Sequence, residues 1–328
     1  MAIIYKVAVY KYLSSTQLKR LFWEHAEHQT AAKRLTQLVR AGFLRRRFIH
    51  SKATDEGHNS RLAVFDWPGP CQTKLKQHCI DRRVEDRWQS YAVVIKSHAH
   101  DKTVSSGFLR HEIAISEFFL CLEEAATREG WRLWWMRTSS PLTKGVSCWV
   151  TLDPDAPNSD AVHFSPDSVY ALADPQQQFR LGTLEYETRD KQKSRQAYRR
   201  RLRGHQAVAE QNIFAEILAQ FIAAYHVPLH TDPTRVGMHV LSVARDVSPR
   251  DDLFLACASL YSPAVRFSFA SLTDVTPATI LSPIWLRTDE GVGGVPAQQP
   301  LLPGGPPVTR SSIERHELAT VPRVSRSD

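Results

Sequence analysis

The sequence predicts a mixed α/β protein in which a small, basic, mainly helical module precedes a larger α/β domain. Three observations predict this organisation. Basic charge is concentrated in residues 1–50, a WPGP break begins at Trp67, and apolar strands alternate with helices between residues 106 and 287. We therefore place a first domain at 1–66, a connector at 67–105, a second domain at 106–287 and a disordered Pro/Gly-rich tail at 288–328.

The first domain begins with three short helices. An apolar helix is expected over 3–12, and Ser14 or Ser15 caps a second one with the sequence STQLKRLFW. A third helix is expected from about Thr30 to Arg40, and Gly42 ends it because a left-handed residue is favoured at that position. Its apolar residues point inward and its polar residues outward, so the third helix is amphipathic.

Two strands, FLRRRFIH and RLAVFDW, follow the third helix and complete the pattern of a winged helix-turn-helix. In that motif the third helix enters the major groove of DNA while cations of the wing contact phosphates. An interaction module that uses the same fold without DNA is the alternative. The residues expected to contact DNA are Lys33, Arg34, Gln37, Arg45, Arg46 and Arg47.

The charge distribution favours a polyanionic partner. The chain of 328 residues has a formal net charge of +8, and residues 1–50 carry ten Lys or Arg against two Glu, which equals that whole excess. A basic domain on a near-neutral body points to nucleic acid. No apolar run approaches the roughly 20 residues that a membrane-spanning helix needs, and the five cysteines form no pairing pattern. We expect a cytoplasmic protein without a membrane partner.

The second domain is expected to have the order α-β-β-β-α-β followed by α-β. A helix from about Leu109 ends at Gly130, and a strand WRLWWMR leads into a poorly patterned loop at 139–160. The remaining expected elements are a strand at 163–172, its hairpin partner at 178–188, a long helix at 190–211, a strand at 236–244, a helix at 249–261 and a strand at 265–272.

Three carboxylates lie at strand ends in this domain. Strand alternation puts Glu185 and Glu187 on the face of Leu181, and Asp167 on the face of Val169. Buried carboxylates need a partner, and Mg²⁺ prefers such oxygens, so Mg²⁺ is the cofactor they would take. The alternative is a solvated strand end that forms salt bridges with the next helix. Between Lys191 and His205 that helix carries seven Lys or Arg and no acid, and Arg195 and Arg199 are candidates for contacts with DNA phosphates.

The order of elements, with P-D…E-x-E, resembles the PD-(D/E)xK nuclease superfamily. The chain as a whole more closely resembles the replication-relaxation family of plasmids and other mobile elements, which pairs a winged helix with a PD-(D/E)xK-like domain. The matching stretches are QLVRAGFLRRR, LRHEIAISEFFLCLEEAA, PDSVYAL, LEYETRDK, HVLSVA…PRDDLF and PIWL.

The resemblance implies roles for individual residues. Asp167 and Glu185 fall on the two motif acids, which would bind the metal. Glu187 falls where most of these nucleases carry a Lys, although the mobile-element family usually has an acid there too. Lys193 would replace that Lys, contact phosphate or lie on the solvated surface. Glu112 or Glu117 on the first helix would add a metal oxygen or form a surface salt bridge.

Three functions remain open at this point. The first is a double-stranded DNA-binding accessory protein that acts in plasmid replication, relaxation or mobilisation, together with replication or mobilisation proteins. The second is a Mg²⁺-dependent endonuclease or nickase that uses Asp167, Glu185 and Glu187. The third is a winged-helix transcription regulator whose second domain does not catalyse. Winged helices often bind as dimers, so a homodimer is also left open.

Overall fold

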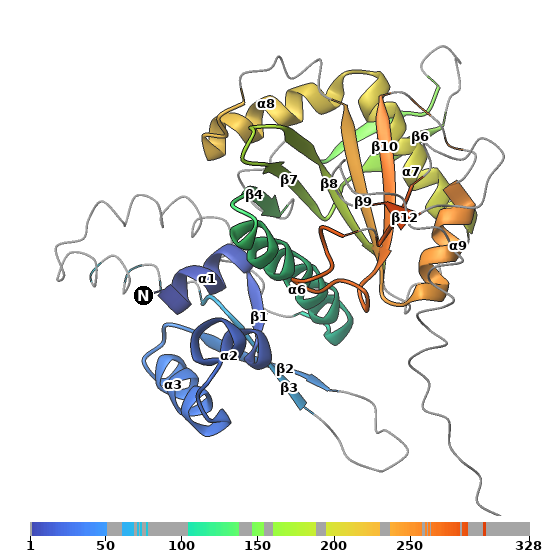
Figure 1. Cartoon of the computed structure of the whole chain (residues 1–328). Coiled ribbons are helices and arrows are strands. Elements are labelled where there is room, and N and C mark those ends of the chain that lie inside the picture. The colour runs from blue at the N-terminus through green and yellow to red at the C-terminus, as the bar shows by residue number, and fades with distance from the viewer. Residues whose placement is uncertain are drawn as a thin grey trace, which may run out of the picture. The chain divides into compact units, whose positions relative to one another are not determined.

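The computed structural model describes residues 2–50, 61–68, 104–137, 146–153, 160–187, 195–229, 237–257, 264–282 and 284–287, with residues 298–299 and a few single positions. The chain is a mixed α/β protein with two compact units (Figure 1). Unit 1 comprises Met1–Phe119 with Ser139–Lys144, and unit 2 comprises Leu120–Thr138 with Gly145–Asp328. The division falls inside helix α6 (Ser106–Arg128), so the first half of that helix belongs to unit 1.

Unit 1 contains a three-stranded antiparallel sheet with the order β1-β3-β2. The three expected helices and both expected strands are present, and β1 is an additional strand that the sequence pattern does not predict because it is only three residues long. The elements are α1 (Ala2–Tyr10), β1 (Tyr12–Ser14), α2 (Ser15–Trp23), α3 (His28–Arg40), β2 (Arg45–His50) and β3 (Arg61–Asp66).

Local signals in the sequence define the ends of the helices in unit 1. Ser14 caps α2 in a full capping box, in which its hydroxyl accepts from Gln17 N and its own backbone N–H donates to the Gln17 side chain. Gly42 has φ of 74°, as expected for the glycine that ends α3. Helix α1 ends earlier than expected, because Lys11 adopts φ of 64° and turns the chain into β1.

The first half of α6 packs on unit 1 through polar as well as apolar contacts. Ser116 Oγ donates to the Tyr12 carbonyl at 2.8 Å, and Gln17 Nε2 donates to Glu117 at 2.8 Å. Arg20 forms a salt bridge with the same Glu117 at 2.5 Å. For Glu117, the structure therefore supports a salt bridge over a role as a metal ligand.

Unit 2 is built on a seven-stranded sheet with the order β12-β11-β10-β9-β8-β7-β4. Strands β8, β9 and β10 are parallel, and β7 is antiparallel to both of its neighbours. The strands are β4 (Arg132–Arg137), β7 (Ser168–Ala173), β8 (Phe179–Glu187), β9 (Met238–Ala244), β10 (Val265–Ser271), β11 (Trp285–Arg287) and β12 (Gln298–Gln299).

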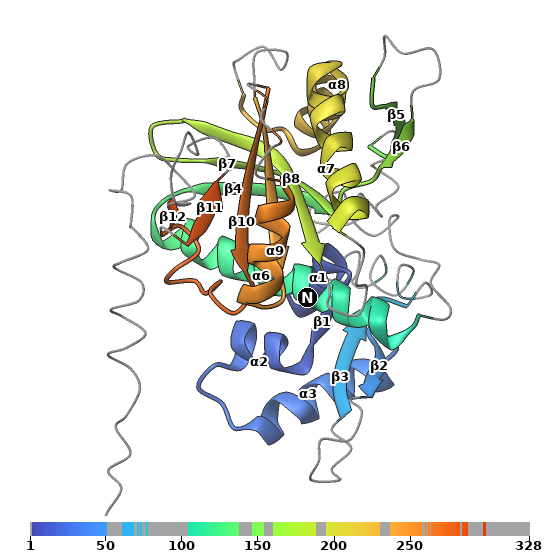
Figure 2. The same cartoon turned by 90° about the vertical axis from the view of Figure 1, so that its right-hand side faces the viewer.

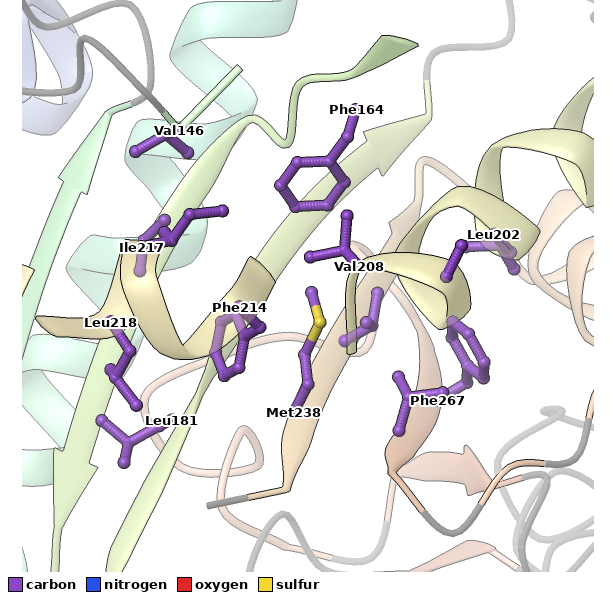
Figure 3. Close-up of a cluster of buried hydrophobic side chains, with 14 of the residues drawn as sticks. Val146, Phe164, Leu181, Leu202, Val208, Phe214, Ile217, Leu218, Met238 and Phe267 are labelled. Atoms are coloured by element: carbon purple, nitrogen blue, oxygen red, sulfur yellow. The ribbon is translucent and has the colours of Figure 1, made fainter. Parts of the chain in front are cut away.

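Three helices cover one face of this sheet: α7 (Arg195–Glu210), α8 (Ile213–Tyr225) and α9 (Val247–Cys257). Figure 2 shows α7 and α9 beside the strands, and Figure 3 shows the apolar core between α7, α8 and the sheet. Leu202, Phe214 and Leu218 from the helices meet Leu181 and Phe267 from the strands, and all are buried. Burial of this apolar surface is the main source of stability for unit 2.

A separate two-stranded sheet, β5 (Cys148–Thr151) and β6 (Ala161–Phe164), packs on α7. Gly204 of α7 permits this close approach, because a Cβ there would lie 2.5 Å from Val162 Cγ1. The expectation of one strand over 163–172 is therefore wrong. Pro166 separates β6 from β7, and the two strands belong to different sheets.

Other expectations for unit 2 also need correction. The loop expected at 139–160 contains β5, and a second helix, α8, follows α7 where no helix was expected. Strand β10 is not the last strand, since β11 follows it. Gln298 and Gln299 form β12 inside the tail expected to be disordered, whereas residues 288–297 and 300–328 lie outside the described residues.

Candidate functional site

Glu185 and Glu187 lie near the carboxyl end of β8 on the same face of the sheet, as strand alternation predicts. This is the face that α7 covers. Glu185 is only 1% exposed, while Glu187 is half-buried. A carboxylate as buried as Glu185 needs compensating charge or hydrogen bonds.

Two side chains of α7 supply that compensation. Arg201 Nη1 donates to Glu185 Oε2 at 2.9 Å, and Arg201 Nη2 donates to Glu187 Oε1. His205, one turn further along α7, places Nε2 3.1 Å from Glu185 Oε1. Both oxygens of Glu185 are therefore in contact with a cationic or protonatable group of α7.

His205 makes two further contacts in this position. Its Nδ1 lies 3.2 Å from the Arg201 carbonyl oxygen. The imidazole and Phe164 rings meet edge to face, with centroids 4.9 Å apart, and His205 and Glu185 are both buried.

The charge balance at Glu185 favours its ionised form. Burial alone would raise the pKa of Glu185, but the Arg201 guanidinium and the adjacent His205 together bring this pKa below its ordinary value. Arg201 also lies over the Tyr198 ring, 5.3 Å from its centroid, and Tyr198 shares a hydrogen bond with Ser242 of β9. Arg201 is thus held by the two carboxylates and by the Tyr198 ring.

Asp167 lies immediately before β7, in line with the β7–β8 register that pairs Ser168 with Leu184. Its carboxylate Oδ2 accepts a hydrogen bond from Tyr186 N at 2.7 Å, and its own N–H donates to the Leu184 carbonyl. Asp167 therefore ties the two strands together through the backbone. In the described part of the chain, no three His, Cys, Asp or Glu side chains form a group that could bind a metal.

This arrangement does not fit a Mg²⁺ site at Glu185. Mg²⁺ requires carboxylate and water oxygens in near-octahedral geometry, whereas the oxygens of Glu185 already contact Arg201 and His205. A metal ion there would have to displace the guanidinium that also neutralises Glu187. For Glu185 and Glu187, these contacts therefore support salt bridges with the next helix over a metal site.

The basic residues of α7 divide into two groups. Arg201 points toward the sheet, whereas Arg199 and Arg203 are exposed. Arg200 reaches back to the Ala161 carbonyl at 3.1 Å. The side chain of Arg195 and the whole of Lys193 lie outside the described residues.

The basic residues of unit 1 also divide into two groups. Lys33, Arg34 and Gln37 are all exposed on α3, opposite the buried Ala31 and Leu35. The arginines of β2 instead make contacts within unit 1.

Those β2 contacts centre on β3. Arg45 and Arg47 both donate to Asp66 Oδ2 at 2.7 Å. Arg46 donates to Thr36 Oγ1 at 3.0 Å, and its guanidinium lies 5.9 Å from the Phe65 ring centroid. The exposed cations of α3 are therefore better placed for a phosphate backbone than the arginines at the base of the expected wing.

Arg201 and His205 are the residues of this site that sequence reasoning did not single out. The sequence does indicate that these two residues face the sheet. The inward face of α7 is marked by residues at helical spacing: Tyr198, Arg201, Leu202 and His205. Their partners lie 14 to 20 residues earlier on a strand, and only the packing of α7 on β8 identifies them.

Comparisons with models of known protein families, with curated proteins and with solved structures found no match for this chain. Among the described residues, no helix has the length and apolar character needed to cross a membrane.

Proposed function

We propose that the protein binds double-stranded DNA through α3 of unit 1, as an accessory protein in the replication, relaxation or mobilisation of a mobile genetic element. The observation that carries the DNA-binding part is the exposed face of α3. Lys33, Arg34 and Gln37 line this face, and Ala31 and Leu35 anchor its opposite side in the core. Lys and Arg contribute phosphate contacts, while Arg and Gln can also read base edges.

The architecture of unit 1 supports this proposal. Its order is helix, strand, helix, helix and two further strands, which is the order expected of a winged helix-turn-helix. The capping box defines the start of α2, and the glycine after α3 defines the end of the helix proposed to contact DNA. The paired arginines of β2 act in this scheme as a brace for the β2–β3 hairpin through Asp66.

The mobile-element role rests on the resemblance of the chain to the replication-relaxation family. In unit 2 the antiparallel strands β4, β7 and β8 are followed by helices and then by the parallel strand β9, which agrees with the order expected from that resemblance. Asp167 and Glu185 lie at neighbouring ends of β7 and β8. The Arg201 contacts favour an accessory role for this nuclease-like unit over strand cleavage. Its exposed Arg199 and Arg203 would add phosphate contacts, which a purely sensory second domain of a regulator would lack.

The test is a binding titration with a labelled duplex at constant salt. Lys33→Glu/Arg34→Glu should weaken binding by at least about tenfold, since two phosphate contacts become repulsions. The matched control is Arg128→Glu/Arg132→Glu, which changes the net charge equally at exposed positions of unit 2. If both variants lose affinity equally, binding follows net charge and α3 is not the contact helix.

A further inference from the structure

A second polar cluster lies on the face of the sheet opposite Glu185. The β-register places Tyr170 beside Gly182, Gly182 beside His239, and His239 beside Arg266 in one row across four strands. Arg180 is two residues from Gly182 on β8 and therefore shares its face. Arg287 of β11 pairs with Ser268, whose hydroxyl lies 2.8 Å from His239 Nε2. We call Tyr170, Arg180, His239, Arg266 and Arg287 the arginine–histidine cluster.

The centre of this cluster is buried. Tyr170 is 0% exposed, His239 is 5% exposed and Arg287 is 6% exposed, while Arg180 is half-buried and Arg266 is exposed. The cluster therefore runs from the interior of unit 2 to its surface. The rings of Tyr170 and His239 lie across Gly182 from each other, with centroids 6.5 Å apart in an edge-on arrangement. Gly182 cannot carry a side chain, because a Cβ would lie 1.7 Å from the His239 carbonyl oxygen.

Several polar atoms in the cluster lack a hydrogen-bond partner among the described residues. They are Tyr170 Oη, His239 Nδ1 and Arg180 Nε, each shielded from solvent. A buried polar atom without a partner costs about 1–3 kcal/mol, so each of these atoms needs a partner such as a water molecule, an ion or a bound ligand. All three atoms can donate, provided that the Ser268 hydroxyl donates to His239 Nε2 and leaves the proton on Nδ1.

The electrostatics of the cluster point in the same direction. Burial, followed by Arg287, Arg266 and Arg180, keeps the pKa of His239 well below its ordinary value, so this imidazole is neutral near pH 7. Burial and the neighbouring Arg266 also lower the pKa of Arg180, while Tyr170 and Asp174 oppose this effect. Asp174 also accepts a hydrogen bond from Gln178 N in its own turn, so part of its charge is used locally. Positive groups thus repel one another here, and an anion would relieve that repulsion.

We propose that the arginine–histidine cluster binds a phosphate group. Arginine offers planar, forked donors that match phosphate oxygens, and the tyrosine hydroxyl and neutral imidazole add single donors from the interior. Arg266 and Arg180 lie on the exposed side, where the rest of a phosphate-bearing molecule would extend. The cluster lies entirely within unit 2 and on the face opposite the carboxylates, so phosphate binding there is independent of DNA binding by α3.

The test measures the melting temperature of the intact protein in increasing inorganic phosphate at constant ionic strength, with chloride as the reference. Binding to the folded state should raise the melting temperature with phosphate concentration. Tyr170→Phe removes only a buried hydroxyl that has no partner among the described residues, so the protein without phosphate should be as stable as the wild type. Its phosphate affinity should fall about tenfold, as expected for one hydrogen bond to a charged group.

Arg180→Gln provides a second variant, and its affinity should also fall by about tenfold or more. Arg132→Gln is the matched control, because it removes the same charge from an exposed position on the other face of the sheet and should leave phosphate binding unchanged. No phosphate-dependent shift in the wild type, or equal shifts in all four proteins, would overturn the proposal.

Two sources of the phosphate group can be separated with the same variants. Adenosine monophosphate and a short duplex are titrated in parallel with inorganic phosphate. If the natural source is a nucleotide, the monophosphate binds more tightly than inorganic phosphate and Tyr170→Phe leaves duplex affinity unchanged. If it is the DNA backbone, Tyr170→Phe weakens duplex binding and the monophosphate gains nothing over inorganic phosphate.

Discussion

Arg201 Nη1 lies 2.9 Å from Glu185 Oε2, and the second guanidinium nitrogen of the same arginine reaches Glu187. One side chain of α7 thus pairs with both acids at the end of β8. These two contacts occupy carboxylate oxygens that a metal ion would otherwise bind. They also link α7 to β8 through a salt bridge.

Removal of Arg201 should destabilise unit 2 strongly. Arg201→Gln leaves Glu185 buried without its main counter-charge, a change that typically costs about 3–5 kcal/mol. Chemical denaturation measures the loss. Arg203→Gln, at an exposed position two residues along the same helix, should change stability little. Equal stability of the two variants would show that the ion pair does not contribute to folding.

The stability of the protein should fall in acid partly because of Glu185. Its pKa is lowered in the folded state from an ordinary value of 4.5, so the unfolded chain takes up the proton first as the pH drops. The stabilisation is complete above that ordinary value and is lost as the pH falls toward the folded pKa. Glu185→Gln should flatten the stability profile below pH 4.5, whereas an unchanged acid slope would contradict the assignment.

DNA cleavage should be absent or at background level. Supercoiled plasmid is incubated with the protein and Mg²⁺ or Mn²⁺, at concentrations that saturate DNA binding. The native protein and Asp167→Ala/Glu185→Ala should give equal nicking, because Arg201 and His205 hold the oxygens that a metal would need. Nicking by the native protein alone would restore the endonuclease hypothesis and show that a metal displaces the arginine.

DNA binding should depend steeply on salt. If about five phosphates are neutralised, the logarithm of the binding constant should fall with log[salt] at a slope of about −4 to −5. Titrations at four or more salt concentrations give this slope. In Lys33→Glu/Arg34→Glu the slope should become shallower. A binding constant of the wild type that does not change with salt would show that phosphate contacts do not drive binding.

Gly182 should tolerate no side chain. Gly182→Ala places a Cβ against the His239 carbonyl and should destabilise the protein by about 1–3 kcal/mol or more, because β8 and β9 must separate. Gly107→Ala is the control, since a Cβ at that position meets only Ser105 Oγ at 4.0 Å. Thermal melting of both variants measures the difference, and an unaffected Gly182→Ala protein would show that the two strands are not this close.

Several features could be predicted from the sequence because they depend on neighbours along the chain. The Ser14 cap, the glycine that ends α3, and the shared face of Glu185 and Glu187 are all consequences of helical or strand periodicity. Breaks of that periodicity were harder to locate. The three-residue β1 and the split between β6 and β7 at Pro166 escape it because such short segments contain too few repeats to show a period.

By itself the sequence determined the α/β class, the order of most helices and strands, and the exposed basic face of α3, since each follows from local propensity and spacing. Only the tertiary structure decided the partners of the charged groups. Arg201 and His205 meet Glu185 because α7 packs on β8, and Arg180 and His239 come together because β8 and β9 pair in one register. The properties of a buried charge depend on groups that are distant in sequence, and for this reason spacing alone left both a metal site and a salt bridge with the next helix open.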